Sequence, residues 1–146
     1  MPEDQEKNLC LLRVFRRCAH LQHHRKCRFP GQGRILILLK QKEKLTQREL
    51  MDLTDLRSAT LSEQLEKMES AGMILRGRNA EDRRSVDLQL TEKGRQMACE
   101  AEQERADTAN ALFGVLTAAE KEQLSAILEK LYGVWSQDEL CREERT

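Results

Sequence analysis

The hydrophobic period of this chain changes at residues 73–90, and this change constrains the fold more than any other feature of the sequence. Residues 86–90 (VDLQL) alternate apolar and polar side chains, which is typical of a half-buried strand. Residues 73–75 (MIL) form a short apolar run, and the segment between the two is polar and rich in arginine. These residues therefore predict a β-hairpin with a charged tip, set between segments of helical periodicity.

The composition favours helix outside this hairpin. Aromatic residues make up 3% of the 146 residues and charged residues 34%, with only 2 Pro and 7 Gly to interrupt helices. The length is typical of one domain. We therefore expect one domain over residues 1–146, mainly α-helical with a small β-hairpin.

Helical periodicity and capping patterns predict where the helices lie. Thr46 with Glu49, and Thr117 with Glu120, have the spacing of capping boxes, in which a threonine hydroxyl and a glutamate satisfy the first free backbone N–H groups. Pro30, Gly31 and Gly33, which favour turns, are expected to end the first helix. The predicted helices span residues 9–28, 33–42, 46–53, 58–71 and 91–113, and a last helix begins at Thr117.

The helices at 46–53 and 58–71 have the spacing of a helix-turn-helix. Small hydroxyl side chains near the start of the second helix can approach phosphates and base edges, and Arg57 is long enough to reach guanine. Arginines at the hairpin tip can enter a neighbouring minor groove. This order of elements predicts a winged helix-turn-helix that binds double-stranded DNA. Its exposed candidates are Arg57, Ser58, Thr60, Ser62, Lys67, Arg83 and Arg84.

Charge is unevenly distributed, although the formal net charge is +0. The stretch from Lys7 to Lys42, with both ends included, contains ten basic residues and no acidic residue, whereas the last third of the chain is acidic. This pattern suits a DNA-binding part joined to an acidic helical part. A solvated surface of uneven charge is the alternative interpretation.

The last predicted helix carries an apolar face that little else in a chain of this size can cover. We therefore expect it to pack, together with the first helix, on a second copy of the chain in a homodimer. The face is formed by Leu124, Ile127, Leu128, Leu131 and Trp135.

Residues 45–75 and 81–94 together resemble the MarR family of bacterial regulators. Asp82 and Arg84 match the D-x-R part of the family's wing pattern, and residues 90–94 (LTEKG) match its L-T-x-x-G part. The resemblance implies a two-fold dimer held by its terminal helices, with the helix at 58–71 in the major groove and the wing in the minor groove. It also implies a pseudo-palindromic operator and repression of nearby genes.

The resemblance also implies roles for single residues. Arg84 would reach into the minor groove, Asp82 would orient it, and Arg83 would contact phosphate. Base and phosphate contacts are implied for Arg57, Ser58, Thr60 and Ser62, and Gln47 and Lys67 complete the candidate DNA-binding set. The domain assignment that follows is a winged helix-turn-helix DNA-binding lobe at residues 33–92 and dimerisation helices at 9–28 and 93–140.

Three switches are compatible with these residues. The resemblance favours a small organic effector that binds between the dimerisation helices and the DNA-binding lobe, shifting the dimer toward a form that misses one half-site. A thiol switch is the second hypothesis, with Cys10, Cys18 and Cys141 as redox candidates. A cysteine on a helix face more often serves as a small hydrophobic residue, and Cys18 on the apolar side suits that role.

A metal-responsive regulator is the third hypothesis. It rests on His20, His23, His24 and Cys27, which share one arc of the predicted first helix. Arginines on the same arc would repel a cation, so a solvated basic face is the favoured interpretation.

Other classes of protein find less support in the sequence. We find no phosphate loop and no catalytic motif of the kinds that enzymes carry, and we expect no cofactor. A helical dimerisation adaptor that does not bind DNA is the main alternative. A polar N-terminus and the lack of a long apolar run predict a cytoplasmic protein without a membrane partner.

Overall fold

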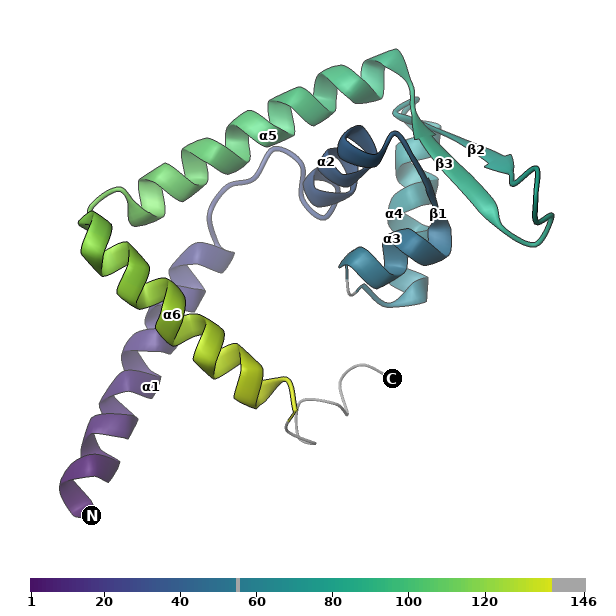
Figure 1. The fold of residues 1–146 in the computed structure, drawn as a ribbon. Coiled ribbons are helices and arrows are strands. Elements are labelled where there is room, and N and C mark those ends of the chain that lie inside the picture. Colours follow the sequence, from purple (N-terminus) through teal and green to yellow (C-terminus); the bar gives the residue numbers. More distant parts are fainter. Residues whose placement is uncertain (55, 138–146) are drawn as a thin grey trace.

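The computed structural model describes residues 1–54 and 56–137, and it confirms a mainly helical fold with a small antiparallel sheet (Figure 1). The sheet has the strand order β1-β3-β2. Helix α5 leads from the sheet to the far end of the molecule, where α6 crosses α1. In chain order the elements are α1 (Pro2–His23), α2 (Gly33–Lys42), β1 (Lys44–Thr46), α3 (Gln47–Thr54), α4 (Ser58–Ser70), β2 (Ile74–Arg78), β3 (Val86–Leu90), α5 (Glu92–Phe113) and α6 (Ala118–Trp135).

The hydrophobic core lies where α2, α4 and the sheet meet the first half of α5. Helix α2 buries Ile35, Leu36 and Leu39 almost completely. Helix α4 buries one stripe, Leu61, Leu65 and Met68, whose spacing places them on the same side of the helix. We call the unit formed by α2, β1, α3, α4, β2 and β3 the lobe, and the hairpin at residues 74–90 the wing. Because its interior is well filled, the lobe presents its polar residues from a fixed framework.

The first helix differs from the prediction of 9–28 at both ends. It begins at Pro2, a residue that suits the first helical position, and Glu3 and Asp4 favour the positive end of the helix dipole. It ends at His23, well before Pro30. The segment that follows is held by α5 instead, because the backbone N–H of Arg28 donates to both carboxylate oxygens of Glu104, at 3.0 and 3.2 Å.

Strand β1 was not predicted from the sequence. It is only three residues long and pairs with β3, with Lys44 opposite Gln89 and Thr46 opposite Asp87. The hydroxyl of Thr46 also accepts from the backbone N–H of Glu49 at 3.1 Å, which was one of the two bonds expected of a capping box. The strand therefore runs directly into α3.

The capping box at the start of α6 is confirmed. The Thr117 hydroxyl accepts from the Glu120 backbone N–H at 3.2 Å, and the Glu120 carboxylate accepts from the Thr117 N–H at 3.0 Å. This backbone hydrogen bond is the main reason that the pKa of Glu120 lies below its ordinary value. No helix among the described residues is long and apolar enough to cross a membrane.

The junction between the wing and α5 explains the residues 90–94 (LTEKG). The Thr91 hydroxyl accepts from the Gly94 N–H at 3.0 Å and donates to the carbonyl of Gly72 at 2.6 Å. Gly94 lies against the Met73 carbonyl oxygen so closely that a Cβ atom there would overlap it. Glycine at this position therefore allows the first turn of α5 to pack directly against the backbone of the residues that precede β2.

We expect Gly94→Ala to lower the free energy of unfolding by about 1–3 kcal/mol, because the backbone of Met73 must move to make room. Urea denaturation of the two proteins measures this difference. Gly77→Ala is the matched control, since a Cβ atom there would meet no described atom within 4 Å. Equal denaturation midpoints for the two variants would contradict this account of Gly94.

Candidate nucleic-acid interface

Helix α4 begins with the polar residues that were predicted to contact DNA. Arg57 is extended, with φ −66° and ψ 146°, and starts the helix as its N-cap. Ser58 and Thr60 are exposed in the first turn, where free backbone N–H groups and the helix dipole favour anions. Because the apolar stripe of α4 faces the core, these side chains lie on the outer part of the lobe.

Gln47, Ser62 and Lys67, which were predicted to contact DNA, make side-chain contacts within the lobe. Gln47 of α3 donates from Nε2 to the Ser62 hydroxyl of α4 at 3.0 Å, which links the two helices of the helix-turn-helix. Ser62 keeps its own hydroxyl hydrogen for a further acceptor. Lys67 pairs with Glu63 at 3.1 Å, and both side chains are more than half exposed, so this ion pair contributes little stability.

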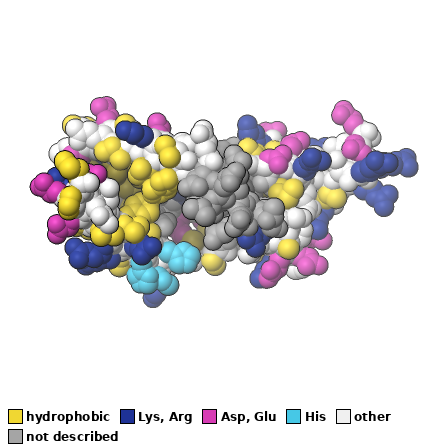
Figure 2. Space-filling view, turned by 90° about the horizontal axis from the view of Figure 1, so that it is seen from below, with side chains coloured by type: hydrophobic (Ala, Val, Ile, Leu, Met, Phe, Trp, Pro, Cys, Tyr) yellow, Lys and Arg dark blue, Asp and Glu magenta, His cyan; other side chains and the backbone are white. Residues whose placement is uncertain are grey.

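The wing tip presents Arg83 and Arg84 to solvent. Asp82 accepts from the Arg84 backbone N–H at 3.0 Å through Oδ1 and from the Ser85 hydroxyl at 3.3 Å through Oδ2. The carboxylate therefore holds the backbone that carries Arg84. Figure 2 shows Lys and Arg side chains gathered at the end of the molecule to which the wing projects.

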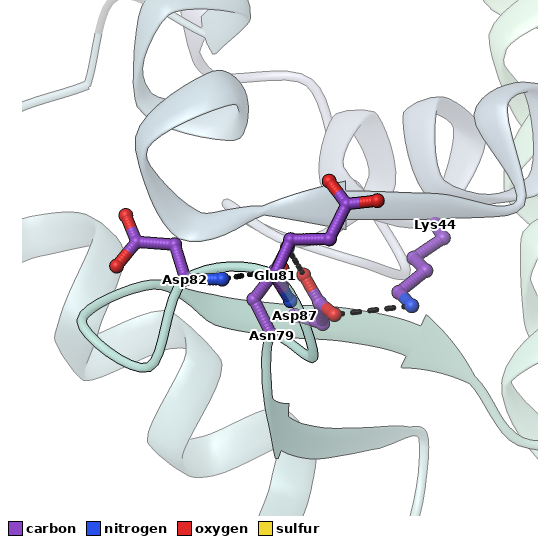
Figure 3. Close-up of polar contacts among 5 residues, drawn as sticks. All are labelled: Lys44, Asn79, Glu81, Asp82 and Asp87. Atoms are coloured by element: carbon purple, nitrogen blue, oxygen red, sulfur yellow. Dashed lines mark hydrogen bonds and ion pairs between the residues drawn. The ribbon is translucent and has the colours of Figure 1, made fainter.

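A polar cluster beneath the tip escaped the sequence analysis. Asp87 of β3 is only 7% exposed and lies between Lys44 of β1 and Asn79, which directly follows β2 (Figure 3). Its Oδ2 pairs with Lys44 Nζ at 3.1 Å, and its Oδ1 accepts from Asn79 Nδ2 at 2.9 Å. Asp87 occupies a polar position in the alternating strand, so the sequence pattern placed it toward solvent.

The cysteine candidates lie apart from this interface. Cys10 and Cys18 are exposed on α1, and Arg13 Nη2 lies 3.8 Å from Cys10 Sγ. Cys141 lies outside the described residues. A hydrogen bond to Glu104 is the main cause that raises the pKa of the Cys27 thiol, with burial adding to it. This environment keeps Cys27 protonated, which disfavours the thiolate that an oxidant sensor requires.

The predicted arc of metal ligands does not form. His20 and His24 have ring centroids 4.3 Å apart, and those of His23 and His24 are 5.3 Å apart. Because α1 ends at His23, Cys27 does not continue the helical arc. Within the part of the chain that the structure describes, no group of three or more His, Cys, Asp or Glu residues is placed to hold a metal ion.

A cavity of about 640 Å³ lies between the α1–α2 connection, α2, the end of α3 and α5. Its walls are mainly apolar, and two arginines also reach it. We call it the α2–α5 cavity. Residues that line it include Phe29, Arg34, Ile37, Leu56, Arg105 and Leu112.

Comparisons with known proteins agree with this arrangement. The model of the MarR family matches residues 30–86. The HTH-type transcriptional regulator YwhA of Bacillus subtilis is 32% identical over 100 residues, which are 68% of this chain and 72% of that protein.

Two solved structures share the fold. A mutant of MarR from E. coli complexed with operator DNA superposes with a TM-score of 0.71 at 21% identity, over 86% of this chain and 95% of that one. BpsR of Bordetella bronchiseptica, whose DNA binding is regulated by 6-hydroxynicotinic acid, superposes with a TM-score of 0.68 at 20% identity, over 85% and 91% of the two chains. The fold, the family model and the sequence relative together show that this chain belongs to the MarR family of transcription regulators.

Proposed function

We propose that the chain is a repressor that binds a pseudo-palindromic operator as a homodimer. Residues 33–92 act as the DNA-binding lobe, with α4 in the major groove and the wing in the minor groove. The observation that carries this proposal is the placement of Arg57, Ser58 and Thr60 at the start of α4 in the same lobe as the exposed tip arginines. The fold shared with a MarR protein complexed with operator DNA supports it.

Apolar surface on α1 and α6 supports the homodimer. The two helices bury none of their described side chains, and Leu11 and Ile127 are 67% and 55% exposed. Phe15 and Trp135 pack edge to face, with ring centroids 5.8 Å apart, yet each is still almost half exposed. Figure 2 shows hydrophobic side chains gathered at the end of the molecule that α1 and α6 form. A second copy of the chain would cover this surface.

The α2–α5 cavity supports release by a small organic effector. Its size is typical of a ligand pocket, and it lies between the helices proposed to dimerise and the lobe proposed to bind DNA. A molecule that binds only one spacing of the two lobes in the dimer would shift the population toward that spacing.

Arg84→Ala should weaken operator binding by roughly 1–3 kcal/mol, because the contact of a guanidinium in the groove is lost. The measurement uses a labelled duplex from upstream of the chain's own gene at two salt concentrations. Binding of the native protein to this duplex should weaken steeply as the salt concentration rises. Lys121→Ala on α6 is the control and should bind as the native chain does. If Arg84→Ala and Arg57→Ala both bind the operator normally, the assignment of these two residues to the DNA interface is wrong. If the native chain selects no DNA site at all, the alternative of a dimerisation adaptor that does not bind DNA is favoured.

Ile127→Asp should weaken self-association by at least about tenfold, because a charge would replace an apolar side chain at the interface. Sedimentation equilibrium over a range of concentrations measures this effect. Ala126→Asp introduces the same charge on the same helix, on the side away from Leu124 and Leu131, and should change association less. A native chain that stays monomeric at high concentration would rule out the homodimer.

Ala109→Trp should fill part of the α2–α5 cavity and weaken the effector response by at least about tenfold without loss of operator binding. The test is a screen of small organic molecules, neutral and acidic, for release of the labelled operator. Ala106→Trp, one turn earlier on α5, is the control. A molecule that releases the operator equally from both variants would bind outside the α2–α5 cavity. If peroxide releases the operator and dithiothreitol restores binding, the thiol switch is favoured instead.

A further inference from the structure

We propose that Asn79 and Asp87 are positioning residues that fix the wing tip in the conformation that presents Arg83 and Arg84. This inference rests on the proposed function of the wing as a minor-groove reader. It assigns a role in DNA binding to two residues whose side chains lie beneath the tip.

Asp87 provides a fixed acceptor at the base of the tip. It lies in the central strand, opposite Gly77 of β2 and Thr46 of β1. Both of its carboxylate oxygens are engaged, one by Lys44 Nζ and the other by Asn79 Nδ2. A carboxylate that is 7% exposed must keep such partners, because its burial without them is costly.

Asp87 also determines which way the Asn79 amide faces. An ionised carboxylate only accepts hydrogen bonds, so it selects the orientation that points the NH₂ group of Asn79 toward it. The Asn79 oxygen then points into the tip, where it accepts from the backbone N–H groups of Glu81 at 2.8 Å and Asp82 at 3.1 Å (Figure 3). The reversed amide would repel both Asp87 and these N–H groups.

Further hydrogen bonds connect Asn79 to the backbone that carries the tip arginines. The Asn79 backbone N–H donates to the Ser85 carbonyl at 3.0 Å, and the Ser85 N–H donates to the Asp82 carbonyl at 3.0 Å. Asp82 in turn accepts from the Arg84 N–H. The exposed tip therefore connects through successive hydrogen bonds to a buried strand residue. An ordered tip lowers the entropy that would otherwise be lost when its arginines bind in a groove.

An exchange of the two side chains tests this inference. Asn79→Asp places two carboxylates together and should expel residue 79 from the tip, whereas the double variant Asn79→Asp with Asp87→Asn restores one donor and one acceptor facing each other. We expect the Glu81 and Asp82 amide hydrogens to exchange with solvent at least about tenfold faster in the single variant and at nearly the native rate in the double variant. Gln89→Ala, an exposed position on the same side of β3, is the control and should exchange at the native rate.

Operator binding gives the second measurement. Asn79→Asp should weaken binding about five- to tenfold, and the double exchange should restore it. In an Arg83→Ala, Arg84→Ala background the same change should have almost no effect, because it acts through the arginines.

Two results would overturn the inference: unchanged amide exchange in Asn79→Asp, or an equal loss of operator binding with and without the tip arginines. Amide exchange is measured on the free protein, so it tests the positioning of the tip even if the native chain binds no operator. A native chain that binds no operator would count against the proposed function alone.

Discussion

The described structure is assembled around the buried helix α2. Ile35, Leu36 and Leu39 are at most 1% exposed, and α2 contacts α5 as well as α3, β1 and β3. A helix enclosed in this way joins the helix-turn-helix, the sheet and the long helix α5 into one packed unit. A change in the position of α5 must therefore be accommodated by the lobe. The α2–α5 cavity lies beside this contact, where a bound molecule would act directly on it.

The two ends of the molecule differ in chemistry, and the net charge of zero conceals this difference. The wing end carries exposed arginines, whereas the end formed by α1 and α6 exposes apolar side chains beside the basic and histidine side chains of α1 (Figure 2). Polyanion binding and self-association make opposite demands on a surface. The length of α5 separates the two kinds of surface, as the proposed function requires.

The wing shows how a small set of polar contacts can organise an exposed turn. Its strands are held by backbone pairing with register Gly77 opposite Asp87 and Arg78 opposite Val86. The turn beyond them has few apolar side chains to bury, so its conformation depends on Asn79, Asp82 and the carboxylate of Asp87. Removal of the buried charge of Asp87 can thus alter how arginines at the surface are presented.

The elements that local chemistry specifies could be predicted from the order of the amino acids. Helical spacing of Leu61, Leu65 and Met68, the capping box at Thr117 and the alternation of residues 86–90 each depend on neighbours within a few positions. These patterns were sufficient to predict the helix-turn-helix, the hairpin and the resemblance to the family. The arginines of the wing tip were found in the same way, because their exposure follows from the turn between two strands.

Features that join distant parts of the chain could not be predicted in this way. Strand β1 exists because its residues, such as Lys44 opposite Gln89, pair with β3. The first helix ends earlier than predicted, and the segment after it is held by the hydrogen bond from the Arg28 N–H to Glu104. The burial of Asp87 depends on Lys44 and Asn79, which come from two other segments. No local pattern contains this information, since each contact gains its free energy only after the intervening chain has folded and brought the partners together.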